Sequence, residues 1–132
     1  MKNKTIDMKT IKQSHFINAT PEEVYTSLTN PLTIELWSGY PAEMQLVEGS
    51  EFTIYEGDIS GKNIFLIPNQ QLVQEWYFGE NTEKSIVTIN LKPSGGGTHV
   101  ELEHTNVPDE DFENMEEGWR SYYWGAIKKY FK

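Results

Sequence analysis

Histidines are the residues of this chain best suited to acid–base chemistry or metal binding, and there are three of them, His15, His99 and His104. His99 and His104 lie five residues apart in one predicted strand. Because successive side chains of a strand point to opposite faces, this odd interval separates the two imidazoles and argues against a shared metal site. His104 follows Val100 and Leu102 on the apolar face, where a lone histidine is most often a hydrogen-bonded core residue. We therefore predict no metal site, no cofactor and no catalytic residue.

Two pairs of acids could also do acid–base work. Glu56 and Asp58, and likewise Glu101 and Glu103, stand two residues apart, so each pair shares one face of a predicted strand. Such a pair becomes catalytic where burial raises the pKa of one member. Glu101 and Glu103 alternate with apolar residues and are therefore expected on the solvent side. We interpret the paired acids as solvated surface.

A glycine-rich stretch, Ser94-Gly-Gly-Gly97, raises the question of phosphate binding. A phosphate-binding loop needs a helix that begins directly after it, whereas a strand is predicted to follow here. The stretch is therefore interpreted as a hairpin turn. The sequence also contains no nucleophile elbow, zinc-protease motif or Walker loop.

The aromatic residues indicate binding and not covalent catalysis. Four Trp, seven Tyr and six Phe make up 13% of the chain, so many of the rings must line the space between a sheet and a helix. Large flat rings enclose pockets, which are mostly apolar with a few polar groups; alternatively, the rings pack against one another and leave no space. The expected polar anchors are Gln74 and His104. The full set of predicted ligand-binding residues is Trp37, Phe52, Gln74, Trp76, Phe78, His104, Trp119 and Tyr123.

Local signals near the N-terminus predict a strand followed by two short helices. Alternating residues suggest the strand at Ile11–Ala19. The segment Thr20-Pro-Glu-Glu23 combines a capping hydroxyl, proline at the first helical position and glutamate at the third, which predicts the start of a helix. Asn30-Pro31 ends that helix and caps a second one, expected over Leu32–Trp37.

Between residues 42 and 107 the pattern changes to short β-rich runs separated by turn residues, which is typical of an antiparallel meander. Six strands are predicted in this region, and one of the turns between them falls at Glu80–Lys84. The strands are Ala42–Val47, Glu51–Gly57, Lys62–Ile67, Leu72–Gly79, Ser85–Pro93 and Thr98–Val107. With the first strand this makes seven.

The last segment, Pro108–Lys132, is predicted to form one long helix that covers the sheet. Gly118 lies within it and suggests a bend or a close contact at that turn. Apolar residues recur at steps of three and four and define a single apolar face. They are Phe112, Met115, Trp119, Tyr122/Tyr123, Ala126, Ile127 and Tyr130.

Composition narrows the class of protein. A formal net charge of −9 at pH 7 disfavours binding to a nucleic-acid backbone. The absence of cysteine fits a reducing compartment, and no apolar run approaches the roughly 20 residues that a membrane span needs. We expect a cytoplasmic monomer with no nucleic-acid partner and no membrane span. Residues 1–10 are expected to be a flexible tail, and residues 11–132 a single domain.

Six short segments, in one order, resemble the START-like (SRPBCC) superfamily of helix-grip domains, and within it the family of activator of heat-shock-protein-90 ATPase homologues. No segment is specific alone, but together they cover residues 11–132. They are Ala19-Thr-Pro-Glu-Glu-Val-Tyr25, Leu36-Trp37, Glu48-Gly-Ser-Glu-Phe52, Leu72-Val-Gln-Glu-Trp76, Thr98-His-Val-Glu-Leu102 with His104, and Glu117-Gly-Trp119 with Tyr122-Tyr-Trp124. The resemblance implies an α+β helix-grip fold. In this fold a curved seven-stranded antiparallel sheet wraps around a long C-terminal helix, with two short helices between strands 1 and 2.

The resemblance is compatible with three functions. The first, which the aromatic residues favour, is a non-catalytic domain that binds a hydrophobic small molecule in the groove between the sheet and the C-terminal helix. The second is a regulator that contacts a chaperone and stimulates its ATPase; eukaryotic members that do so carry an additional N-terminal domain, for which this sequence has no room. The third is a cyclase- or hydrolase-like enzyme that uses the same cavity, with His104 as the base.

Overall fold

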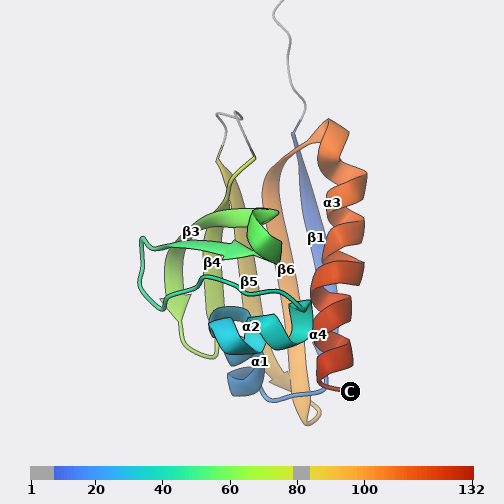
Figure 1. Ribbon diagram of the computed structural model, residues 1–132. Coiled ribbons are helices and arrows are strands. Elements are labelled where there is room, and N and C mark those ends of the chain that lie inside the picture. The colour runs from blue at the N-terminus through green and yellow to red at the C-terminus, as the bar shows by residue number, and fades with distance from the viewer. Residues whose placement is uncertain (1–7, 79–83) are drawn as a thin grey trace, which may run out of the picture.

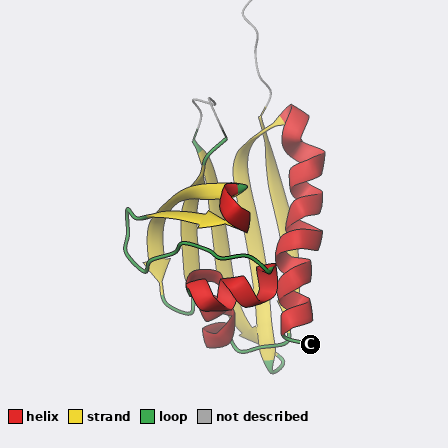
Figure 2. Ribbon diagram, viewed as in Figure 1, coloured by secondary structure: helices red, strands yellow, loops and turns green. Residues whose placement is uncertain are grey.

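The computed structural model describes residues 8–78 and 84–132, which form a six-stranded antiparallel sheet and its helices (Figure 1). The strand order is β1-β6-β5-β4-β3-β2, so the first and last strands are neighbours. Figure 2 shows two short helices across one end of the sheet and a long helix running beside β1 and β6. The strands are β1 (Met8–Ile17), β2 (Glu51–Ile54), β3 (Ile59–Ile67), β4 (Gln71–Trp76), β5 (Ser85–Ser94) and β6 (Gly97–Pro108).

The core lies between the sheet and the helices. On the sheet side of the core, buried and exposed residues alternate along β5 and β6 as predicted, because a strand directs every second side chain to the same face. The two acids Glu101 and Glu103 are exposed, as expected. The buried residues of these two strands include Val87, Ile89, Leu91, Val100, Leu102 and His104.

The strand predicted at Ala42–Val47 is not formed, and the sheet therefore has six strands instead of seven. This segment makes one isolated bridge, between Glu43 and Thr53. A side-chain hydrogen bond is found here instead of a longer ladder of backbone hydrogen bonds. The buried amide of Asn63 donates to the Gln45 carbonyl at 3.2 Å. The Gln45 carbonyl therefore has a partner although no strand lies beside it, and the segment stays irregular.

Strand β2 also ends earlier than predicted, at Ile54 instead of Gly57. The next three residues, Tyr55, Glu56 and Gly57, have positive φ angles of 56°, 57° and 96°. An extended strand cannot continue through this left-handed region. The chain therefore turns back directly into β3.

Strand β1 begins at Met8, so three residues predicted for the flexible tail belong to the sheet. Residues 1–7 of that tail lie outside the described residues. The same holds for residue 79, where the strand predicted at Leu72–Gly79 ends, and for residues 80–83 of the predicted turn.

Two short helices, α1 (Pro21–Thr29) and α2 (Pro31–Ser38), form where predicted. Both halves of the capping box are present at Thr20: its hydroxyl accepts the Glu23 N–H at 3.2 Å, and the Glu23 carboxylate accepts the Thr20 N–H at 2.9 Å. These helices bring Trp37 into the core, where its indole N–H donates to the Ser27 carbonyl at 2.7 Å.

The C-terminal helix changes type along its length. A turn at Asp109–Asp111 leads into α3 (Phe112–Gly118), a π-helical segment (Trp119–Trp124) and α4 (Gly125–Tyr130). A π-helical turn holds more residues than an α-helical one, so Trp119, Tyr123 and Trp124 are all buried against the sheet. The predicted apolar face was therefore wrong in three places. It omitted the buried Trp124, and it included Tyr122 and Tyr130, whose side chains are 68% and 42% exposed.

Two glycines differ in what they do for this helix. A Cβ atom on Gly125 would lie 2.7 Å from the Arg120 carbonyl oxygen, so the π-helical segment requires glycine at this position. Gly118 has no described atom within 4 Å of its Cβ position. The predicted irregularity therefore begins directly after Gly118, whereas the close contact is at Gly125.

A buried histidine of the sheet holds the middle of the helix. Nδ1 of His104 accepts the indole N–H of Trp119 at 3.0 Å. Its Nε2 therefore carries the proton and donates to the Ser85 hydroxyl at 2.8 Å, which in turn donates to the Thr105 carbonyl at 2.9 Å. This arrangement needs the neutral imidazole, and burial lowers the pKa of His104 to about 3.

His15 in β1 makes a similar attachment. The Lys128 ammonium donates to its Nδ1 at 2.9 Å, its Nε2 donates to the Gln13 side-chain oxygen at 2.8 Å, and the Gln13 amide donates to the Glu116 carbonyl at 3.0 Å. Burial, together with the charges of Lys128 and Arg120, lowers the pKa of His15 to about 4. The helix is thus tied to β1 through a second neutral histidine.

Replacement of Trp119 by alanine is expected to lower the free energy of unfolding by about 3–5 kcal/mol, because it leaves a cavity and an unpaired Nδ1 on His104. This is a large part of the roughly 5–15 kcal/mol that stabilises a typical domain. Urea denaturation followed by circular dichroism measures the loss. Tyr122→Ala, in the same helical segment, is the matched control and should cost less than about 0.5 kcal/mol. Equal losses in the two variants contradict the orientation of the helix.

The free energy of unfolding is also expected to fall between pH 7 and pH 5. The folded-state pKa values of His15 and His104, about 4 and about 3, lie below the ordinary value of 6.5. The unfolded chain therefore binds more protons in this window, and stability that is complete above pH 6.5 is lost as the pH falls toward the folded-state values. Each histidine accounts for a loss of about 2 kcal/mol at pH 5.

Urea denaturation at several pH values tests this in the wild type and in His15→Gln. Between pH 6 and pH 5 the free energy of unfolding should fall less steeply with pH in the variant than in the wild type. The difference in slope should be about 1 kcal/mol per pH unit, close to the value for one proton. An unchanged slope would mean that His15 is already protonated in the folded protein.

Candidate functional site

A stacked pair of tryptophans lies at the centre of the aromatic cluster. The ring centroids of Trp76, from β4, and Trp119, from the C-terminal helix, are 4.7 Å apart, with 21° between the ring planes. The ring centroids of Tyr123 and Trp119 are 4.5 Å apart, and those of Trp37 and Tyr123 are 5.2 Å apart. The rings thus form a continuous wall from the sheet to α2.

Buried polar groups fix the orientation of both indoles. Trp76 donates its N–H to the Gln74 side-chain oxygen at 3.0 Å, and the Gln74 amide donates to the Asn63 side-chain oxygen at 2.9 Å. Trp119 donates its N–H to His104. Rotation of either ring would leave a buried group unpaired, at a cost of about 1–3 kcal/mol. The wall is therefore rigid before any ligand arrives.

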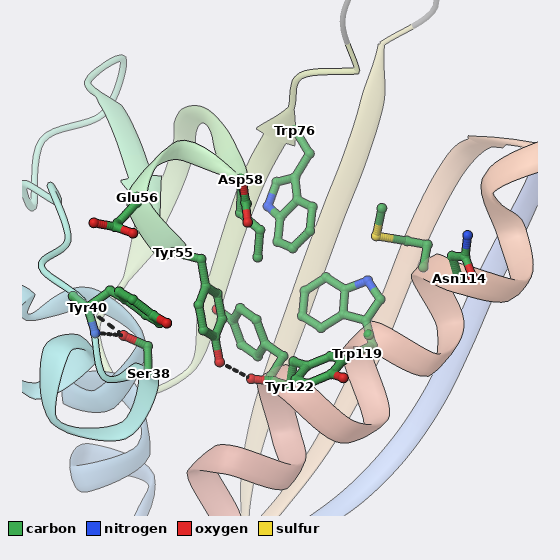
Figure 3. Close-up of a pocket in the computed structure, with 13 residues that line it drawn as sticks. Ser38, Tyr40, Tyr55, Glu56, Asp58, Trp76, Asn114, Trp119 and Tyr122 are labelled. Atoms are coloured by element: carbon green, nitrogen blue, oxygen red, sulfur yellow. Dashed lines mark hydrogen bonds between the residues drawn. The ribbon is translucent and has the colours of Figure 1, made fainter.

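An open pocket of about 640 Å³ lies beside this wall (Figure 3). Four parts of the chain form it: the end of α2 with the residues that follow, the turn between β2 and β3, the end of β4, and the C-terminal helix. Its volume is within the range of about 300–1,000 Å³ that is common for small-molecule sites. Its aromatic lining consists of Tyr40, Tyr55, Trp76, Trp119, Tyr122 and Tyr123.

The turn Tyr55–Gly57 closes one side of the pocket. The Tyr55 hydroxyl donates to the Tyr122 carbonyl at 2.6 Å and so joins the turn to the helix, as Figure 3 shows. Tyr40 packs on Tyr55 with the ring centroids 5.9 Å apart. Left-handed φ angles at non-glycine residues cost on the order of 1 kcal/mol each and persist only where other contacts hold them. Such strain tends to gather at binding sites, which supports a role for this turn.

One buried hydroxyl in the pocket lining lacks a partner. Tyr123 is only 2% exposed, and its hydroxyl has no hydrogen-bond partner among residues 8–78 and 84–132. Burial raises the pKa of Tyr123, and the nearby Tyr55 raises it further by a smaller amount. The group is therefore a neutral phenol. A buried unpaired hydroxyl costs about 1–3 kcal/mol.

The structure brings part of the predicted ligand-binding set together. The pocket is lined by three of its members, Trp76, Trp119 and Tyr123. Two more line adjacent hollows: Phe78 a recess of about 330 Å³ and Trp37 a groove of about 560 Å³. The remaining three are buried and line none of these hollows; they are Phe52, Gln74 and His104.

Gln74 and His104, the expected polar anchors for a ligand, bind the two tryptophans instead. Both ring nitrogens of His104 are hydrogen-bonded inside the core, and its pKa is lowered to about 3. The imidazole therefore does not reach the pocket and is poorly suited to act as a base there. Its role is to position Trp119.

Sequence reasoning missed Tyr40 and Tyr55. Both lie next to turns that interrupt the predicted pattern. Gly39 ends α2 one residue before Tyr40, and Gly57 with its polar neighbours signals a turn inside the strand that was predicted at Glu51–Gly57. A glycine flanked by acids was the available sign that the strand ends early and that Tyr55 leaves the sheet.

In the part of the chain that the structure describes, no group of three or more His, Cys, Asp or Glu side chains is arranged to hold a metal ion. No helix there has the length and hydropathy needed to cross a bilayer.

The sequence matches the protein family described as "Activator of Hsp90 ATPase homolog 1-like protein" over residues 18–132. It is 29% identical over 114 residues to the Activator of 90 kDa heat shock protein ATPase homolog 1 of Homo sapiens. It is 31% identical over 127 residues to the Activator of 90 kDa heat shock protein ATPase homolog of Dictyostelium discoideum. These matches cover 85% and 93% of this chain but 34% and 33% of the two relatives. The chain thus spans about a third of the length of the curated relatives it matches.

Solved structures show the same fold. An HSP90 activator from Plasmodium falciparum superposes with a TM-score of 0.84 at 22% identity, covering 91% of this chain and 94% of that one. The Aha1 dimer from Colwellia psychrerythraea gives a TM-score of 0.82 at 19% identity, covering 93% and 96%. The predicted α+β fold, an antiparallel sheet with a long C-terminal helix, is confirmed apart from its number of strands. The chain belongs to the family of Activator of Hsp90 ATPase homolog 1-like proteins.

Proposed function

We propose that this domain binds a hydrophobic small molecule in the pocket beside Trp76 and Trp119. The observation that carries the proposal is the rigid wall of stacked rings, whose indole N–H groups are both bonded within the protein. An apolar ligand can pack against this wall without any loss of hydrogen bonds.

The binding site lies at the mouth of the groove between the sheet and the helix. The stack of Trp76 on Trp119 fills the groove itself, and His104 lies in the core beyond it. A ligand therefore contacts the turn between β2 and β3 and the end of α2, in addition to the helix. This geometry supports reversible binding, since one side of the pocket is formed by a single turn.

Gly118 allows a direct test of the pocket. It lines the pocket, its φ and ψ angles are −59° and −43°, and no described atom lies within 4 Å of its Cβ position. Gly118→Phe therefore places a ring in the pocket without a clash at Cβ. Gly118→Ala is the matched control; it leaves most of the volume free and should stabilise the helix by about 1 kcal/mol.

Fluorescence titration with the neutral apolar probe N-phenylnaphthylamine measures the effect. The wild type and Gly118→Ala should bind the probe with similar Kd, and Gly118→Phe at least about tenfold more weakly, a loss of about 1.4 kcal/mol. Equal binding by all three proteins, or no binding by the wild type, contradicts the proposal.

A second function, regulation of a chaperone ATPase, is favoured by the names of the relatives. Both curated relatives are named as activators of the ATPase of a 90 kDa heat shock protein. Beside the pocket, Leu32, Leu36 and Tyr122 are 73%, 67% and 68% exposed. Large exposed apolar side chains that gather on one face are typical of a protein contact surface.

The test is the ATP turnover of the 90 kDa heat-shock chaperone of the same organism with this protein added. Turnover should rise with the wild type and rise less with Leu36→Glu or Tyr122→Glu, because a charge disrupts an apolar contact. Phe65→Glu, an exposed position on β3, is the control and should act like the wild type. Unchanged turnover at saturating concentration removes this function.

A further inference from the structure

The charged side chains that line the pocket all have the same sign. Glu56 and Asp58 contribute carboxylates from the turn between β2 and β3, and no Lys, Arg or His belongs to the lining among the described residues. The adjacent recess shares Asp58 and adds Asp111, again without a basic residue. Lys129 lines the groove on the other side of Tyr55, not this pocket. An anionic ligand would find no counter-charge here.

Three aromatic residues of the lining, Tyr55, Trp76 and Trp119, offer no free donor to an anion. The N–H groups of Trp76 and Trp119 are bonded to Gln74 and His104 in the core. The hydroxyl of Tyr55 is bonded to a backbone carbonyl. A ring face carries the negative end of the ring quadrupole and attracts cations. Figure 3 shows Tyr55, Trp76 and Trp119 arranged around the same opening.

Tyr123 also lines the pocket, and its buried hydroxyl has no partner in the described part of the chain. The phenol is neutral, so it adds no charge to the site. The net charge of −9 adds a long-range field that raises the local concentration of cations.

We propose that the pocket selects an organic cation, an ammonium group on an aryl or alkyl body, over neutral and anionic molecules of the same shape. The inference rests on the proposed small-molecule function and adds the charge of the ligand. The apolar body packs against the stacked tryptophans. The ammonium group lies among the tyrosine faces toward Glu56 and Asp58, where the carboxylates balance its charge.

Three probes that each carry a phenyl ring on a four-carbon chain separate charge from shape: phenylbutyltrimethylammonium, phenylbutanol and phenylbutyrate. Isothermal titration calorimetry gives the Kd of each at low and at physiological salt. The cation should bind at least about tenfold more tightly than the alcohol, with the anion weakest. Its advantage should shrink with added salt, because the carboxylates at the rim are screened.

Paired variants assign the selectivity to the pocket. The double variant Glu56→Gln/Asp58→Asn should bind the cation no more than about threefold more tightly than the alcohol. Its Kd for the alcohol should equal that of the wild type. Glu22→Gln with Glu103→Gln changes the net charge by the same amount at exposed sites outside the pocket. This control should keep the full advantage. An equal loss in both double variants would overturn the assignment to the pocket.

The remaining outcomes distinguish this inference from the function on which it rests. Equal affinity for the cation and the alcohol, or tightest binding of phenylbutyrate, overturns the charge selectivity while small-molecule binding stands. Failure of all three probes to bind overturns both.

Discussion

The contact between Trp76 and Trp119 is the interaction on which the sheet, the helix and the pocket all depend. Stacked rings in a core must still find partners for their N–H groups, and this requirement fixes a neutral His104 in β6 and Gln74 in β4. Gln74 in turn orients Asn63, whose amide bonds the backbone before β2. The loss of the expected extra strand thus follows from the same buried network that holds the rings.

The π-helical segment explains how one helix can supply both a wide inner face and a pocket wall. Its larger turn directs Trp119, Tyr123 and Trp124 inward, so the helix reaches Trp76 on β4 and also His15 on β1, whose ring lies 5.7 Å from Trp124. An α-helical stripe is too narrow for both contacts. The Tyr122 carbonyl that accepts the Tyr55 hydroxyl belongs to the same segment. The irregular turn of the helix is therefore part of the site.

The sequence predicts those features that depend on periodicity or on a local cap. The start of α1 at Thr20 and the burial of Trp119 are of this kind. The prediction fails where a side chain competes with the backbone or with a ligand. The segment before β2 has the residue pattern of a strand, but Asn63 donates a hydrogen bond to its Gln45 carbonyl, and no ladder of backbone hydrogen bonds forms. Inward polar residues such as Gln74 look alike in a sequence whether their partner is a ligand or the N–H of a neighbouring ring, so the anchors were assigned to the wrong partner.

The two proposed functions share one face of the molecule, and this has a thermodynamic consequence. The backbone of Tyr122 holds the turn Tyr55–Gly57 over the pocket, while its exposed side chain stands beside Leu36 at the adjacent groove. A ligand that shifts the turn also changes the apolar surface offered to a protein partner. Linkage then requires the partner to alter the affinity for the ligand by the same factor that the ligand alters the affinity for the partner. The two proposals therefore do not exclude each other.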